Sequence, residues 1–223
     1  MDAYDLEDFM TILKRSGVPK GYRLWTAGSV SSPVDVRIEL ARDEHNCVLG
    51  SVIDARLAGD KHTGWLLVSG KVGRGKTTWI TAAFNDYCKR RLRRFREGGP
   101  GENNLPIWIT EAGLFTNADR SAAGGYSGRA SYIDRIAKAP LLVLDDLGGS
   151  RRKPTESQSS MIRFIMQERH AHDRPTFMST NIDSWEQLER MYGDHIVSRM
   201  IEQTEGMMVL KGPDRRLQKV NNE

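Results

Sequence analysis

Hydrophobic positions recur along this chain with two spacings, one typical of amphipathic helices and one of short buried strands. Residues 4–14 show the helical spacing, and Gly17-Val18-Pro19 then ends the segment. The pattern predicts a short helix whose apolar face carries Leu6, Phe9, Met10 and Leu13. A further helix is predicted over residues 36–57.

From residue 65 onward the chain alternates short apolar runs with helical segments, which predicts a parallel sheet covered by helices. The predicted strands are residues 65–69, 107–110, 141–144, 176–179 and 207–210. Helices are predicted over 76–96, from 111, and over 159–169, 184–191 and 195–202. Residues 97–104 are predicted as a loop, and the glycine- and serine-rich residues 121–131 as a mobile one. The expected fold is therefore α/β, with a five-stranded, mainly parallel sheet and helices on both faces.

A complete phosphate-loop motif joins the first of these strands to the following helix. Residues 70–77 (GKVGRGKT) match G-x-x-x-x-G-K-[ST]. Glycines let consecutive backbone N–H groups surround an anion, and the helix N-terminus adds partial positive charge. Lys76 is expected to reach the β- and γ-phosphates, and Thr77 to ligate Mg²⁺. The candidate nucleotide contacts are Gly70, Val72, Gly73, Arg74, Gly75, Lys76, Thr77 and Thr78. A chance glycine-rich turn is the alternative, which the strand and helix on either side disfavour.

Two acidic residues follow the third predicted strand. Asp145 lies where a Walker B carboxylate holds Mg²⁺, and Asp146 where hydrolysing members of the additional-strand class usually have a water-polarising glutamate. The alternative for both residues is that they are strand-end acids that cap the next turn.

Two further polar positions are candidates for sensing the γ-phosphate. Asn181 follows the fourth predicted strand, where it could orient water, or else form an Asx-turn or cap the next helix. Arg199 stands in an apolar helical stretch, where an arginine seldom occurs without a partner. It could be an arginine finger given to a neighbouring subunit, or else a member of an intramolecular salt bridge.

Composition limits the remaining possibilities. The 223 residues correspond to one domain or one domain with a small appendage. No apolar run approaches the ~20 residues of a membrane span, and the acidic N-terminus does not resemble a signal peptide. Two cysteines without a C-x-x-C motif or a Cys/His cluster favour a reducing cytoplasm over a disulfide scaffold or a zinc site.

The mildly basic net charge permits a nucleic-acid partner without requiring one. The net charge is +4, and a dense basic cluster, residues 89–96 (KRRLRRFR), closes the helix after the phosphate loop. Arg90, Arg93 and Arg94 are candidate contacts to the phosphates of single-stranded DNA. The alternative is a solvated helix end whose cations favour the C-terminal dipole.

These motifs together resemble the AAA+ ATPases, and within them the DnaC-type helicase loaders and IstB-type transposition helpers. The similar segments are residues 16–23 (entry motif), 109–115 (second strand), 144–148 (Walker B), 174–181 (sensor 1), 198–199 (finger helix) and 210–216 (terminal G-x-x-x-R). The resemblance implies an AAA+ domain over residues 16–217, a helical extension over 1–15 and a tail over 218–223. It also implies that Arg216 is a sensor-2 residue, although Arg215 fits nearly as well.

The function implied by this resemblance is that of a helicase-loader-like ATPase of DNA replication, encoded by a phage or another mobile element. It would bind ATP and Mg²⁺, form a homo-oligomer with ATP, hydrolyse slowly and contact a replicative helicase. Two departures favour slow hydrolysis, since Arg74 replaces a small residue and Asp146 the commoner glutamate. The alternatives are a transposition helper that delivers a transposase, and a nucleotide-dependent adaptor with little hydrolysis and no DNA role.

Overall fold

The computed structural model describes residues 3–20, 64–96, 105–149, 152–204, 207–210 and 214. Its strands are β1 (Trp65–Ser69), β2 (Ile107–Thr110), β3 (Leu142–Leu147), β4 (Thr176–Thr180) and β5 (Met207–Val209). Its helices are α1 (Ala3–Arg15), α4 (Lys76–Arg96), α5 (Glu111–Ser121), the short 3-10 helix η2 (Ala122–Gly124), α6 (Gly125–Ala137), α7 (Glu156–Ala171), α8 (Trp185–Tyr192) and α9 (Asp194–Thr204). The helix predicted at 36–57 and the loop predicted at 97–104 lie outside the described residues.

The five strands form one sheet in the order β2-β3-β4-β1-β5, and every described pairing is parallel. The predicted α/β fold is therefore confirmed. Strand β4 separates β1 from β3, so the segments following these three strands meet at one edge of the sheet. In open α/β sheets, ligands bind in the crevice outside such carboxyl ends.

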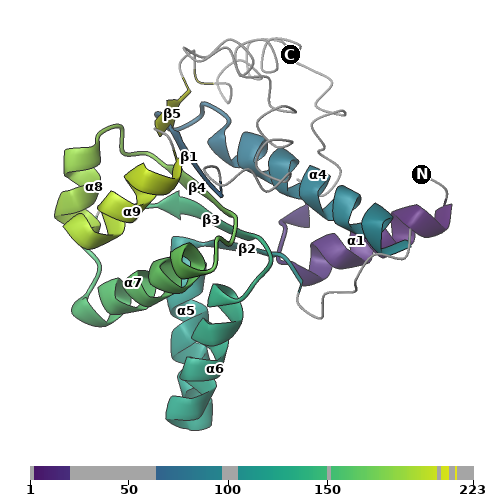
Figure 1. Cartoon of the computed structure of the whole chain (residues 1–223), viewed down its shortest axis with the longest axis horizontal. Helices are drawn as coiled ribbons and strands as arrows, with labels where there is room; N and C mark the ends of the chain where they lie inside the picture. The colour runs from purple at the N-terminus through teal and green to yellow at the C-terminus, as the bar shows by residue number, and fades with distance from the viewer. Residues whose placement is uncertain are drawn as a thin grey trace.

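Helices cover both faces of the sheet (Figure 1). On one face, α4 and α1 enclose a core with Leu66, Val68 and Phe177 from the strands. On the other, α5 to α9 enclose a larger core around Leu67, Leu144 and Met178. Neighbouring residues of one strand thus enter opposite cores, which is why the strands read as continuous apolar runs. No helix in the described ranges is long and apolar enough to cross a membrane.

The predicted helix at the N-terminus, α1, packs against α4. Phe9 and Leu13 are fully buried in the cluster formed with α4. The carbonyl of Ser16 also accepts a hydrogen bond from the backbone N–H of Trp108 in β2, at 2.8 Å. Since Phe9 and Leu13 are covered by the chain itself, they contribute to the packing of α1 against the rest of the domain.

The prediction of a mobile loop over residues 121–131 is wrong. This stretch contains η2 and the first half of α6. The helix is stabilised by burial of Tyr132 and Ile136 further along, which a composition-based interpretation of the glycines and serines does not register. A methyl group on Gly128 would overlap the carbonyl of Ser121, so this glycine permits close packing instead of mobility.

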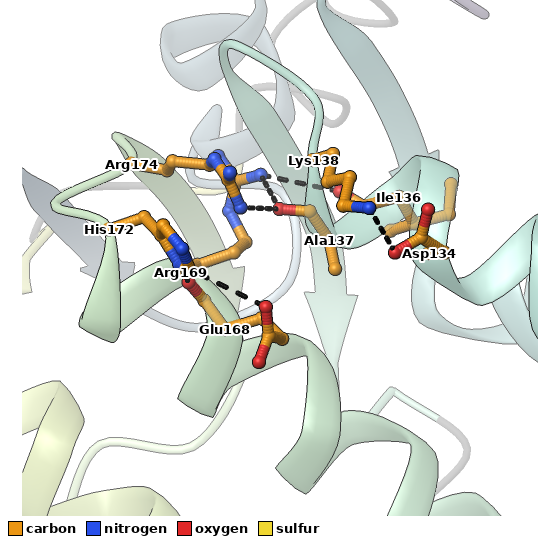
Figure 2. Close-up of polar contacts among 8 residues, drawn as sticks. All are labelled: Asp134, Ile136, Ala137, Lys138, Glu168, Arg169, His172 and Arg174. Atoms are coloured by element: carbon orange, nitrogen blue, oxygen red, sulfur yellow. Dashed lines mark hydrogen bonds and ion pairs between the residues drawn. The ribbon is translucent and has the colours of Figure 1, made fainter.

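A buried arginine, Arg169, connects the segments that enter β3 and β4. Figure 2 shows its guanidinium, beside that of Arg174, at the carbonyl of Ala137 in the segment before β3. The side chain of Arg169, in α7, is fully buried, and all its hydrogen-bond partners in the described residues are neutral oxygens. These are the Thr176 hydroxyl and the carbonyls of Ile136, Ala137, Ala139 and Pro175. Burial, with a smaller effect from the charge of Arg174, lowers the pKa of Arg169 to about 9, so the guanidinium is still charged at neutral pH.

We expect Arg169→Met to lower the free energy of unfolding by at least about 3 kcal/mol. Five hydrogen bonds worth about 1 kcal/mol each are removed, and eliminating the buried charge returns part of that sum. Urea unfolding measures the effect. Arg163→Met is the matched control, since Arg163 lies in the same helix, is only partly buried, and has an Nε without a hydrogen-bond partner. Equal effects from the two substitutions would contradict the special role of Arg169.

Candidate nucleotide-binding site

The phosphate-loop motif folds as a compact turn between β1 and α4. Gly73 and Gly75 have φ angles of +81° and +86°, a region that favours glycine. A Cβ on Gly73 would also overlap the carboxylate of Asp214. Helix α4 begins at Lys76, so the positive end of its dipole faces the turn. This arrangement suits an anion such as a phosphate.

Lys76 joins the loop to the end of β4. Its ammonium group is buried and donates hydrogen bonds to the carbonyls of Gly70 (2.7 Å) and Lys71 (3.0 Å) and to Oδ1 of Asn181 (2.7 Å). All three oxygens are neutral acceptors. A phosphate oxygen placed at the loop would supply the opposite charge.

Asn181 joins Lys76 to Asp146. Its amide nitrogen donates to Oδ1 of Asp146 at 2.8 Å, while its oxygen accepts from Lys76. The alternative role, capping the next helix, belongs to Ser184, whose hydroxyl accepts from the backbone N–H of Gln187. The side chain of Asn181 therefore lies between Lys76 and Asp146, a position compatible with the predicted role in sensing the γ-phosphate.

Asp145 lies at the centre of the site. It is 3% exposed, and its carboxylate accepts hydrogen bonds from the hydroxyls of Thr77, at 3.1 Å, and Ser179. Burial raises the pKa of Asp145, while the bonds from Ser179 and Thr77 act in the opposite direction. The Thr77 hydroxyl and this carboxylate are oxygen ligands of the kind that Mg²⁺ uses together with substrate phosphates. The pair fits the predicted metal role.

Asp146 occupies a strained backbone position next to Asp145. Its φ is +58°, uncommon for a residue other than glycine, and such positions cluster at active sites. Its backbone N–H donates to the Ser179 hydroxyl at 3.0 Å, and its exposed carboxylate contacts Asn181. Asp146 also begins a turn, since its carbonyl accepts a hydrogen bond from the backbone N–H of Gly149 at 2.9 Å. Asp146 therefore takes part in the turn after the strand, as the alternative interpretation expected, and also presents its carboxylate to Asn181.

Three residues of this region were not assigned a role from the sequence. Ser179 holds both aspartates, through its bonds to the Asp145 carboxylate and the Asp146 N–H. Glu111 and Tyr192 form a buried pair beneath the turn that follows Asp146. Two of them could have been suspected from the sequence, because Ser179 is a polar residue within a buried strand and Glu111 is an acid directly after β2.

The other candidate residues lie outside this cluster or outside the described residues. Arg199, in α9, is partly exposed and donates to the carbonyl of His195 at 2.6 Å. No carboxylate in the described ranges pairs with Arg199, so the predicted alternative of a salt bridge is not observed there. Val72 is exposed at the loop, and Arg74 and Thr78 are partly buried. Arg216 and the side chains of Arg90, Arg93 and Arg94 are outside the described residues.

The sheet topology and the phosphate-loop turn define an α/β P-loop fold. No family in a scan of protein families matches the sequence, and no curated protein matches it. Among solved structures, DnaI is similar over 90% of this chain and 95% of its own, with 23% identity and a TM-score of 0.62. The DnaC helicase loader is similar over 72% and 87%, with 20% identity and a TM-score of 0.54. The replication initiator DnaA bound to AMPPCP and single-stranded DNA is similar over 77% and 50%, with 16% identity and a TM-score of 0.57. At the level of the fold, the predicted resemblance to DnaC-type AAA+ proteins is confirmed.

Proposed function

We propose that this chain binds ATP with Mg²⁺ and hydrolyses it slowly, as a helicase-loader-like ATPase of DNA replication. The observation that carries the proposal is the continuous polar network at the carboxyl edge of the sheet. It links the phosphate loop to the C-terminal half of β3 and to the residue after β4, through Lys76, Thr77, Asp145, Asp146 and Asn181. The similar folds of DnaC and DnaI support the loader class.

Each side chain of the network has a distinct task in this proposal. Lys76 binds the β- and γ-phosphates, and Thr77 and Asp145 hold Mg²⁺, which neutralises phosphate charge when bound. The Asp146 carboxylate accepts the proton of the attacking water or polarises it, and Asn181 orients that water. Asn181 already contacts both Lys76 and Asp146, so it is placed between the phosphate-binding and water-activating groups.

The proposed partners are a second copy of this chain, a replicative helicase and single-stranded DNA. ATP would promote assembly, with Arg199 completing a neighbour's site. The DnaA structure holding AMPPCP and single-stranded DNA on a similar fold supports the nucleotide and DNA proposals. A cytoplasmic location follows from this role in replication.

Phosphate release by the purified chain tests the proposal. We expect slow Mg²⁺-dependent turnover of ATP that rises with single-stranded DNA, and co-purification with a hexameric helicase. Recovery of a transposase instead would favour the transposition helper. ATP binding without turnover under all these conditions would favour the adaptor. Asp146 would then be too short, by one methylene, to replace the commoner glutamate in hydrolysis.

Replacing Arg90, Arg93 and Arg94 together by Glu is expected to weaken binding to single-stranded DNA. The three positions lie in the C-terminal half of α4. The slope of log affinity against log salt should become shallower by roughly 0.7 for each phosphate that the variant no longer neutralises. Fluorescence anisotropy with a labelled oligonucleotide at several salt concentrations measures both quantities, and circular dichroism checks folding. Unchanged binding at every salt concentration would show that the basic cluster is only a solvated surface.

A further inference from the structure

A buried carboxylate lies beneath the candidate site without contacting the proposed phosphate or metal ligands. Glu111 is 3% exposed and directly follows β2. Its Oε2 accepts a hydrogen bond from the backbone N–H of Gly148 at 3.0 Å, and its Oε1 accepts one from the hydroxyl of Tyr192 at 2.6 Å. Burial raises the pKa values of both Glu111 and Tyr192.

The two hydrogen bonds of Glu111 join different functional parts of the chain. Gly148 belongs to the turn that starts at Asp146, the proposed water-activating residue. Tyr192 is the last residue of α8, and Gly193, with a φ of +88°, leads from it directly into α9, which carries Arg199. The carboxylate therefore bridges the nucleotide site of a subunit and the helix pair that bears its arginine.

Close packing reinforces this bridge. A Cβ built on Gly148 would lie 2.7 Å from Cδ1 of Ile182, after β4, and 3.2 Å from Sδ of Met191, in α8. The turn after Asp146 cannot shift toward α8 without displacing these side chains, because packed interiors transmit small movements. If position 111 served packing alone, an apolar residue would be more favourable there, since burying a carboxylate costs free energy unless its hydrogen bonds are made.

We infer that Glu111 and Tyr192 are positioning residues that couple the Asp146 turn of one subunit to the α8–α9 pair, and so to the Arg199 that the same subunit offers its neighbour. This inference rests on the proposed function. A change at Asp146 when nucleotide binds would move Gly148. The shared carboxylate would then pass the movement to Tyr192 and to the start of α9.

Hydrogen exchange of the full chain, with and without AMPPCP and Mg²⁺, tests the coupling in the absence of hydrolysis. In the parent protein we expect nucleotide to slow amide exchange at residues 70–77 and to change it in α8 and α9 by about tenfold, a typical size for linked sites. In Tyr192→Phe, which removes only the hydroxyl, protection of residues 70–77 should persist. The nucleotide-dependent change in α8 and α9 should fall below about twofold, which is less than the roughly fivefold lower end of such coupling.

Two substitutions of Glu111 separate hydrogen bonding from packing. In Glu111→Gln, the amide oxygen can accept from Gly148 and the amide nitrogen can donate to the Tyr192 oxygen, so the coupling should persist. Glu111→Leu fills a similar volume without these bonds and should behave like Tyr192→Phe. Tyr126→Phe is the matched control, because Tyr126 is 91% exposed in α6.

The outcomes distinguish the coupling from the proposed function. If residues 70–77 gain no protection from nucleotide in the parent, the proposed function fails, and the coupling with it. If they gain protection and the response of α8 and α9 is the same in Tyr192→Phe and Glu111→Leu as in the parent, the coupling alone is overturned. Thermal melts of each variant confirm that the comparison is made between folded proteins, and Tyr192→Phe decides the result if Glu111→Leu does not fold.

Discussion

Lys76→Ala is expected to weaken ATP binding by about 100-fold or more. The ammonium group is held at the phosphate loop by the Gly70 carbonyl and Asn181, ready to make charge-assisted bonds to two phosphates. Each such bond contributes about 1.5–3 kcal/mol, so removing two of them corresponds to at least about two orders of magnitude in Kd. An equilibrium titration with labelled ATP in the presence of Mg²⁺ measures the change.

Lys71→Ala is the matched control for this substitution. Lys71 belongs to the same loop and carries the same charge, but its side chain is exposed. It should therefore retain nearly all of the ATP affinity. Because Lys76 also contacts loop carbonyls, folding of the variant must be checked by circular dichroism. Unchanged ATP affinity in folded Lys76→Ala would refute the phosphate-loop assignment.

The elements around the phosphate loop could be predicted to the residue from the sequence alone. β1, α4 and β2 begin and end where the spacing of apolar residues places them. Each is a strongly patterned segment whose identity depends on its own residues. In α6, by contrast, the helix depends on burying Tyr132 and Ile136 against other elements, a tertiary effect that overrides the loop-like composition of its first half.

The residues of the candidate site could be predicted from the sequence only where they belong to a recognised motif. The Lys76–Asn181 and Thr77–Asp145 contacts join parts of recognised motifs, and the structure brings both pairs together. The roles of Ser179, Glu111 and Tyr192 depend on which strands are neighbours. The Glu111–Tyr192 bond spans 81 residues, and nothing in the local sequence of either residue indicates the other. The strand order β2-β3-β4-β1-β5 had to be known first.

Arg199→Ala and Asp146→Asn are each expected to bind ATP nearly normally and to lose hydrolysis, for different reasons. Arg199 has no carboxylate partner among the described residues and is partly exposed, so it is available to a neighbouring subunit. Arginines supplied in this way contribute about 10³–10⁵ in rate in other nucleotide hydrolases. Asn at position 146 can still accept the hydrogen bond from Asn181, so this change removes the charge while keeping the contact.

Arg190→Ala is the matched control for the arginine. Arg190 lies in α8 and, like Arg199, donates to the backbone carbonyl four residues earlier. Its removal should leave hydrolysis close to the parental rate. Loss of activity in this variant as well would point to a general effect on the α8–α9 pair instead of a specific role for Arg199.

Mixing the two inactive proteins should restore activity if the site is shared between subunits. An intact site then needs Asp146 from the Arg199→Ala chain and Arg199 from an adjacent Asp146→Asn chain. In an equimolar, randomly assembled ring, about one half times one half, or about a quarter, of the interfaces meet this condition. Steady-state phosphate release should therefore reach about a quarter of the parental rate and rise with protein concentration. If the mixture stays inactive while heteromers form, as shown by differently tagged chains, Arg199 acts within its own chain or only in packing α9.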